Sequence, residues 1–146
     1  NLGLILAVHG ADFLGSTNMP AWALLTSIIL VSSLLNLFIG SASAKWALIA
    51  PVMVPMLTLL GLAPEMATAA YRVGDGATNI ITPLMVYFPL ILIFCQRWQS
   101  NFGLGSLAAT MLPYSIGLLL SGLAMTIFWV VLDLPLGPGA SVFYTL

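Results

Sequence analysis

The feature that most limits the fold of this chain is an uncharged run near its C-terminal end. Residues 106–132 contain no Asp, Glu, Lys or Arg. A helix crosses the hydrocarbon core of a bilayer with about 20 apolar residues, so this run predicts a last membrane helix over 106–132. The whole chain agrees, because 61% of its 146 residues are hydrophobic and 5% are charged, whereas soluble domains carry roughly 25% charged residues. We therefore predict an all-α integral membrane protein surrounded by lipid.

The sequence disfavours several classes of function. Its net charge of −1 provides no basic surface for a nucleic acid. Its single cysteine, Cys95, cannot form an internal disulfide or a cysteine-rich metal cluster. The motifs of ATP-binding loops, zinc proteases, serine hydrolases and dinucleotide sites do not occur in it. We therefore expect a protein that is not an enzyme and that has neither a cofactor nor a nucleic-acid partner.

The start of the chain resembles the end of a membrane helix. Residues 1–8 are apolar and have neither a basic start nor a cleavage site, which argues against a signal peptide. We therefore expect the chain to be the C-terminal portion of a larger protein, whose missing N-terminal part would be its partner. The following residues, His9–Pro20, predict a polar loop in which His9 and Asp12 face water.

Two apolar runs joined by a short segment of small residues follow this loop. They extend from Ala21 to Ile39 and from Ala47 to Leu62, and the linker GSASAKW occupies 40–46. One interpretation is two membrane spans. The other is a re-entrant hairpin over 21–62, which enters and leaves on one side and is tolerated only where its tip is buried or lines a wet cavity. The residues leave both interpretations open, and the tip would contain Gly40, Ser41, Ser43 and Lys45.

A second interrupted element is expected over residues 65–94. The segment AYRVGDGATNIITP, from Ala70 to Pro83, places two glycines inside an otherwise apolar stretch. Because glycine frees the backbone, we predict a discontinuous membrane helix that is broken at 74–76, by Gly74 and Gly76.

Charged side chains inside a membrane are costly, so each is a candidate functional residue. Arg72 and Asp75 are spaced i, i+3 and would pair on one helix face. A structural salt bridge would need no helix break, whereas an ion site would use the carbonyls that a break exposes. We therefore favour an ion-coupling site, to which Thr78 and Asn79 add oxygen atoms.

The linker region offers further candidates whose roles the residues alone leave open. Asn36, Ser41 and Ser43 could be packing residues that hydrogen-bond between helices, or ligands at the hairpin tip. Lys45 could extend its ammonium to the interface, or lie inside the site. Trp46 could belong to the interfacial aromatic belt, or contact a substrate ring.

Two long segments resemble one family of bacterial transporters. GSASAKWALIAPVMVPM (40–56) and AYRVGDGATNIITPLMVYFPL (70–90) are similar to the AbgT family of p-aminobenzoyl-glutamate transporters. The resemblance covers the whole chain, as the C-terminal third or so of a family member. It implies a homodimeric, multi-pass protein of the bacterial inner membrane, of which this chain would form one half of an inverted repeat. It also favours the re-entrant hairpin over two spans.

The resemblance also implies roles for individual residues. Trp46, Arg72 and Pro64 would bind substrate, with Pro64 setting the bend that presents Arg72. The residues implied for ion coupling, with Na⁺ or H⁺ as the coupling ion, are Asp75, Asn36, Asn79 and Thr78.

The function that we predict is ion-coupled secondary active transport of a small anionic aromatic substrate. This substrate would be p-aminobenzoyl-glutamate or a related antimetabolite such as a sulfonamide. One alternative is a dicarboxylate transporter of the same superfamily, and another is a passive channel or structural membrane subunit.

Overall fold

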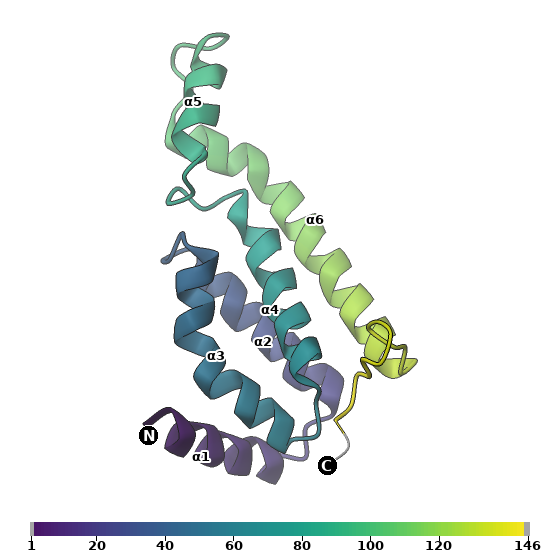
Figure 1. The fold of residues 1–146 in the computed structure, drawn as a ribbon. Coiled ribbons are helices and arrows are strands. Elements are labelled where there is room, and N and C mark those ends of the chain that lie inside the picture. Colours follow the sequence, from purple (N-terminus) through teal and green to yellow (C-terminus); the bar gives the residue numbers. More distant parts are fainter. Residues whose placement is uncertain (1, 145–146) are drawn as a thin grey trace.

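The computed structural model describes residues 2–144, and over this range the chain is all-helical (Figure 1). The described residues contain no strand and form six helices, which are α1 (Leu2–Ser16), α2 (Ala21–Asn36), α3 (Ala42–Leu59), α4 (Pro64–Asn79), α5 (Phe88–Gln96) and α6 (Leu104–Val131). Helices α3 and α6 are long and apolar enough to cross a membrane. The predicted all-α class is confirmed, and α6 covers the uncharged run predicted as the last helix.

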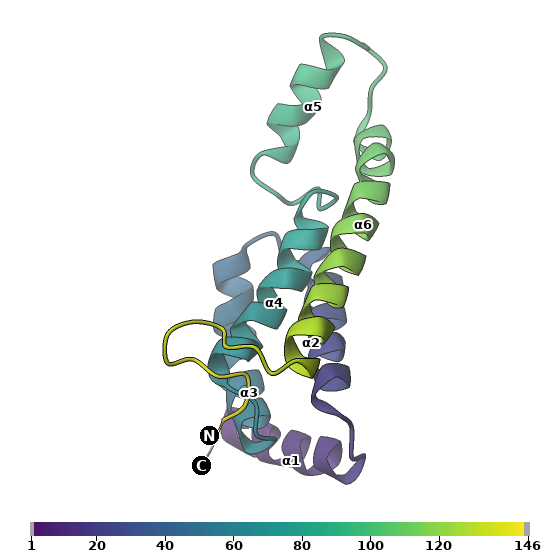
Figure 2. The ribbon, with the colours of Figure 1, turned by 90° about the vertical axis from the view of Figure 1, so that its right-hand side faces the viewer.

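Helices α2 and α3 form a hairpin whose turn lies at residues 37–41. Its two open ends lie near α1, and its turn points away from α1 toward the segment between α4 and α5 (Figure 1). Ser41 caps the second arm, because its side chain accepts a hydrogen bond from the Ala44 backbone N–H at 3.3 Å. Helix α4 packs against both arms, and α6 extends along α4 (Figure 2).

The polar loop predicted for residues 9–20 is mostly helical. Helix α1 continues to Ser16, so His9 and Asp12 lie on a helix, although both are exposed as expected. The apolar residues beyond Asp12 continue the helix, and the true loop spans 17–20. It contains Asn18 with a φ of 46° and ends at Pro20, the residue before α2.

The break predicted at 74–76 is wrong, because α4 is continuous through Gly74 and Gly76. The helical path is interrupted instead at residues 80–87, between α4 and α5. A glycine inside a helix costs only about 1 kcal/mol relative to alanine. Pro83, by contrast, has no backbone N–H to donate and disfavours a helical conformation in the residue before it.

Gly74 is needed for close packing between α2 and α4. A Cβ atom at this position would lie less than 3.0 Å from both the Ser32 Oγ and the Ile29 carbonyl oxygen of α2. Gly76 points the other way, is exposed, and has nothing within 4 Å of the position of a Cβ. Gly74 therefore lets two backbones approach, which is a common use of small residues between membrane helices.

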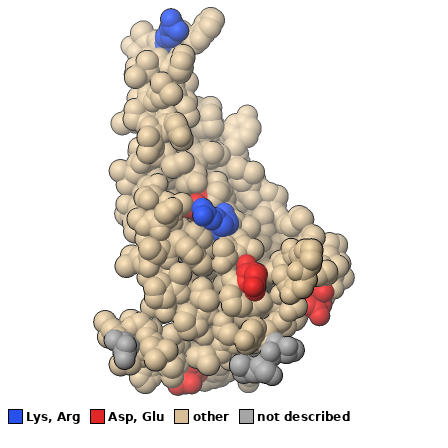
Figure 3. Space-filling model, viewed as in Figure 1, with Lys and Arg blue, Asp and Glu red and all other residues tan. Residues whose placement is uncertain are grey.

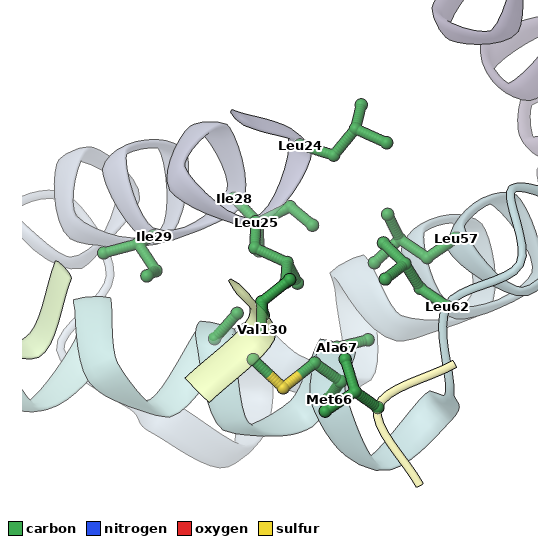
Figure 4. Close-up of a cluster of buried hydrophobic side chains, with 11 residues drawn as sticks. Leu24, Leu25, Ile28, Ile29, Leu57, Leu62, Met66, Ala67 and Val130 are labelled. Atoms are coloured by element: carbon green, nitrogen blue, oxygen red, sulfur yellow. The ribbon is translucent and has the colours of Figure 1, made fainter. Parts of the chain in front are cut away.

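The hydrophobic core lies at one end of the α2–α4 interface (Figure 4). Its buried side chains are Leu24, Leu25, Ile28, Ile29, Leu57, Leu62, Met66, Ala67, Ala70, Val130 and Val142. Both helices change character along their length, because their buried residues are apolar in the first half and mostly polar or small in the second. The apolar end fixes the two helices together, and the polar end forms the site described next.

Candidate functional site

A buried ion pair joins the hairpin to α4. Lys45, in the first turn of α3, contacts the Asp75 carboxylate of α4 through its ammonium group. The two side chains are 0% and 4% exposed. Removing either charge from water costs several kcal/mol, so each group is tolerated here because the other compensates it. Charged side chains are few on the face shown in Figure 3, and most of this surface is uncharged.

Asn36, the last residue of α2, connects this ion pair to the end of α4. Its side-chain oxygen accepts a hydrogen bond from the Lys45 ammonium. Its Nδ2 lies 3.0 Å from the Asp75 carbonyl oxygen, 2.9 Å from Thr78 Oγ1 and 2.8 Å from Asn79 Oδ1. Because the amide has two N–H donors, these three oxygen atoms share them. The four residues predicted for ion coupling therefore lie together.

Hydroxyl groups from neighbouring helices surround this cluster. Ser33 Oγ of α2 lies 3.1 Å from the Gly74 carbonyl oxygen, and Ser32 Oγ lies 3.2 Å from that of Tyr71. Thr82, in the segment after α4, bonds to the Thr78 carbonyl at 2.8 Å. These contacts satisfy polar groups that lipid could not satisfy, and they fix the positions of the helices around Asp75.

Arg72 is the secondary partner of Asp75. Its Nη1 lies 3.8 Å from Asp75 Oδ2, and its side chain is 58% exposed. The predicted i, i+3 pair therefore exists, but Lys45 is the closer and buried partner. Sequence reasoning missed this pairing because Lys45 and Asp75 are 30 residues apart. The only available signal was that Lys45, too, is a charge within an apolar stretch.

An aromatic pair lies beside these charges. The rings of Trp46 and Tyr71 have centroids 4.7 Å apart and an interplanar angle of 37°. The Tyr71 hydroxyl donates to the Ala42 carbonyl oxygen at 2.7 Å, and the Arg72 guanidinium carbon lies 5.8 Å from the centroid of the Tyr71 ring. Trp46 thus packs within the molecule, and sequence reasoning missed Tyr71.

The other predicted residues lie around this centre or apart from it. Ser43 is exposed, and Gly40 lies against the Leu84 backbone, where a Cβ would come within 3.0 Å of the carbonyl oxygen. Pro64 is the first residue of α4. It therefore lies about 16 Å along the helix axis from Asp75. Pro64 lines a hollow together with residues of the C-terminal segment. Any effect of Pro64 on the Asp75 cluster is therefore transmitted along α4.

Arg72 also faces an open hollow between α4 and α6. The hollow is lined mainly by small and apolar side chains, with Ser121 as a polar neighbour. On the α6 side, Ser115 donates to the Ala77 carbonyl oxygen at 2.6 Å and ties this helix to α4. The exposed guanidinium therefore lies where an anionic molecule can reach it.

In this conformation the cluster holds the ammonium group of Lys45 rather than a metal ion. Na⁺ favours carboxylate, amide and carbonyl oxygens, and the cluster contains all three types. Asp75 Oδ1 and Asn36 Oδ1, however, both accept hydrogen bonds from Lys45. No group of three His, Cys, Asp or Glu side chains comes together within residues 2–144. The residues therefore do not fit a sodium ion in this conformation.

Comparisons with known proteins relate the chain to membrane transporters. The sequence model of the AbgT putative transporter family matches residues 1–144. The p-aminobenzoyl-glutamate transport protein of Escherichia coli (strain K12) is 36% identical over 139 residues, which are 95% of this chain and 27% of that protein.

Two solved structures share the fold. The YdaH transporter of Alcanivorax borkumensis matches with a TM-score of 0.90 and 54% identity, over 94% of this chain and 29% of that one. MtrF of Neisseria gonorrhoeae, described as one of a class of antimetabolite efflux pumps, matches with a TM-score of 0.83 and 48% identity, over 95% and 28%. The chain thus spans less than a third of the length of each of these relatives.

Proposed function

Because the chain belongs to the AbgT family of membrane transporters, we propose that it forms the substrate- and ion-binding portion of a secondary active transporter. The substrate that the site fits best is p-aminobenzoyl-glutamate or a related aromatic antimetabolite, such as a sulfonamide. The proposal rests on one arrangement, in which a half-exposed arginine and an aromatic pair lie beside a buried charged cluster.

Two kinds of side chain at the site would recognise the substrate, the exposed guanidinium of Arg72 and the half-buried indole of Trp46. The Arg72 guanidinium is 58% exposed and shares a carboxylate that Lys45 already neutralises. It can therefore form a charge-assisted pair with an anionic group of the substrate. Trp46, which is half-buried and packs on the buried Tyr71 ring, provides an aromatic face for a ring. Pro64, by starting α4, sets the position from which Arg72 is presented. The name of the related p-aminobenzoyl-glutamate transport protein supports a substrate with both an anion and a ring.

The hairpin is proposed to be re-entrant. Helix α2 has 16 residues, which span about 24 Å, less than the roughly 30 Å of a hydrocarbon core. Gly40 in the turn lies against the 80–87 segment, and Lys45 at the start of α3 contacts Asp75, so the tip is held by protein rather than lipid. Movement of this hairpin against α4 would open and close the site, as in alternating access.

The remaining parts of the proposal concern the whole protein. We propose a multi-pass homodimer in the bacterial inner membrane, completed by an N-terminal part with a second such unit. Coupling to Na⁺ or H⁺ would act at the cluster of Asp75, Asn36, Thr78 and Asn79, whose side chains lie together.

Transport by the full-length protein in proteoliposomes tests this function. We expect labelled p-aminobenzoyl-glutamate or a sulfonamide to move against its gradient when an H⁺ or Na⁺ gradient is imposed. Arg72→Ala and Trp46→Ala should each lower kcat/KM by about tenfold or more, because each removes a direct substrate contact worth at least about 1.4 kcal/mol.

Matched controls lie on the same chain. Arg97 and Trp98 are exposed in the connection between α5 and α6, away from the cluster. Arg97→Ala and Trp98→Ala should therefore leave transport unchanged. Equal effects in the site and control variants would contradict the assigned substrate contacts. Flux that stays passive under both gradients would instead indicate a channel.

A further inference from the structure

Lys45 is an unusual residue for the start of the second arm of a membrane hairpin. Its side chain has no exposed surface, although lysine is almost never fully buried unless it is paired. Its ammonium donates to one oxygen from each of two other helices, Asp75 Oδ1 of α4 and Asn36 Oδ1 of α2. The lysine therefore occupies the place where these two oxygens converge.

The charges around this point leave no room for a second cation. One buried ammonium balances one buried carboxylate, and Arg72 adds a further positive charge 3.8 Å from the other carboxylate oxygen. A metal ion added here would lie beside two cations, with one carboxylate to balance all three. In a low-dielectric site, this repulsion would be much stronger than in water.

The Asn36 amide has hydrogen bonds that do not depend on Lys45. The Nδ2 of Asn36 bonds to the Asp75 carbonyl and to the side chains of Thr78 and Asn79, which leaves its Oδ1 directed toward the Lys45 ammonium. Thr78 is fixed in turn by its own bond to the Gly74 carbonyl at 3.0 Å. We therefore expect the Asn36 amide to keep its orientation when the ammonium leaves, with Arg72 as the remaining partner of the Asp75 carboxylate.

We propose that the Lys45 ammonium is a tethered cation that occupies the ion-coupling position in this conformation. An external alkali cation binds Asp75 Oδ1 and Asn36 Oδ1 only by displacing it. Because Lys45 belongs to the hairpin and Asp75 to α4, each exchange releases or restores one bond between these two parts. The inference deepens the proposed ion-coupled transport and rests on it.

Replacing Lys45 with methionine tests this exchange, because methionine keeps most of the side-chain length and removes the charge. The full-length protein is purified in detergent, and its Tm is measured in LiCl, NaCl and KCl against choline chloride at equal ionic strength. In Lys45→Met we expect at least one alkali cation to raise the Tm by several degrees in a saturable way. The half-saturating concentration should be at least tenfold lower than in the wild type, where the lysine competes.

Two further variants separate the causes. In Lys45→Met/Asp75→Asn the cation response should vanish, because the carboxylate is gone. Arg97→Met, which removes an exposed charge in the connection between α5 and α6, should leave the response as in the wild type. A Lys45→Met response no stronger than that of the wild type would overturn the inference.

Failure to fold is also decisive. If Lys45→Met unfolds in every salt while the double variant folds, Asp75 accepts no cation except lysine, and the inference is wrong. If the double variant also fails to fold, Lys45 acts through packing rather than charge, which refutes the inference equally. Transport is measured in parallel, because wild-type protein that moves no substrate would refute the transport function without affecting the Tm result.

Discussion

Substitution of Gly74 by alanine, compared with the same substitution at Gly76, examines how α2 and α4 come together. Both glycines lie inside α4 and are two residues apart. An added methyl group at Gly74 would come within 3.0 Å of Ser32 Oγ and of the Ile29 carbonyl oxygen, whereas one at Gly76 would meet nothing within 4 Å. The two variants therefore have the same intrinsic helix preference and differ in packing.

The expected effects have opposite signs. Alanine stabilises a helix by about 1 kcal/mol relative to glycine, so Gly76→Ala should be neutral or stabilising by up to that amount. At Gly74, overpacking costs about 1–3 kcal/mol. Forcing the helices apart also weakens the hydrogen bonds from Ser32 and Ser33 to α4, worth about 0.5–1.5 kcal/mol each. With the helix preference subtracted, Gly74→Ala should be destabilised by about 1–5 kcal/mol.

The measurement is thermal unfolding of the full-length protein in detergent, followed by tryptophan fluorescence. Gly74→Ala should unfold at a lower temperature than the wild type, and Gly76→Ala at the same or a higher one. Adding Ser32→Ala to Gly74→Ala should recover part of the loss, because it removes one of the two clashing atoms. Equal Tm values for the two single variants would refute the packing argument.

Two smaller predictions concern single hydrogen bonds, each with an exposed control on α6. Ser115→Ala removes the hydrogen bond from α6 to α4 and should lower the free energy of unfolding by about 0.5–1.5 kcal/mol. Ser121→Ala should be neutral in the same unfolding assay, because the Ser121 hydroxyl bonds only within α6. Tyr71→Phe removes the bond to the first turn of α3 but keeps the ring, so it should lower the Tm slightly more than Tyr114→Phe, which is exposed. A Tyr114→Phe loss as large as that of Tyr71→Phe would contradict the second prediction.

Much of the fold follows from local patterns in the sequence. The uncharged run at 106–132 became α6, because helix formation in an apolar segment depends on the segment itself. The small residues at 40–46 indicated that a turn separates two helices, but the turn lies at 37–41 and residues 42–46 begin α3. The sequence also singled out Asn36 and Asp75 as polar side chains in apolar surroundings, where their cost demands a partner, and both are buried.

Other features depend on which segments meet in space. The sequence does not distinguish Gly74 from Gly76, because both lie between the same apolar runs. The packing of α2 on α4 shows that Gly74 lies against the α2 backbone and that Gly76 faces outward. For this reason the helix break was placed wrongly at 74–76 rather than at 80–87. The pairing of Tyr71 with Trp46 was missed for the same reason.

The sequence by itself determined that this is an all-α membrane chain with a hairpin, an interrupted helix and buried charges, because burial cost and helix preference are properties of each segment. Only the tertiary structure decided how the charges are shared. Arg72 lies three residues before Asp75 and remains half-exposed. The buried partner of Asp75 is Lys45, which is 30 residues away in the sequence. An ion pair in a low-dielectric interior is set by distance in space and by desolvation. Both are fixed by how closely the hairpin packs on α4.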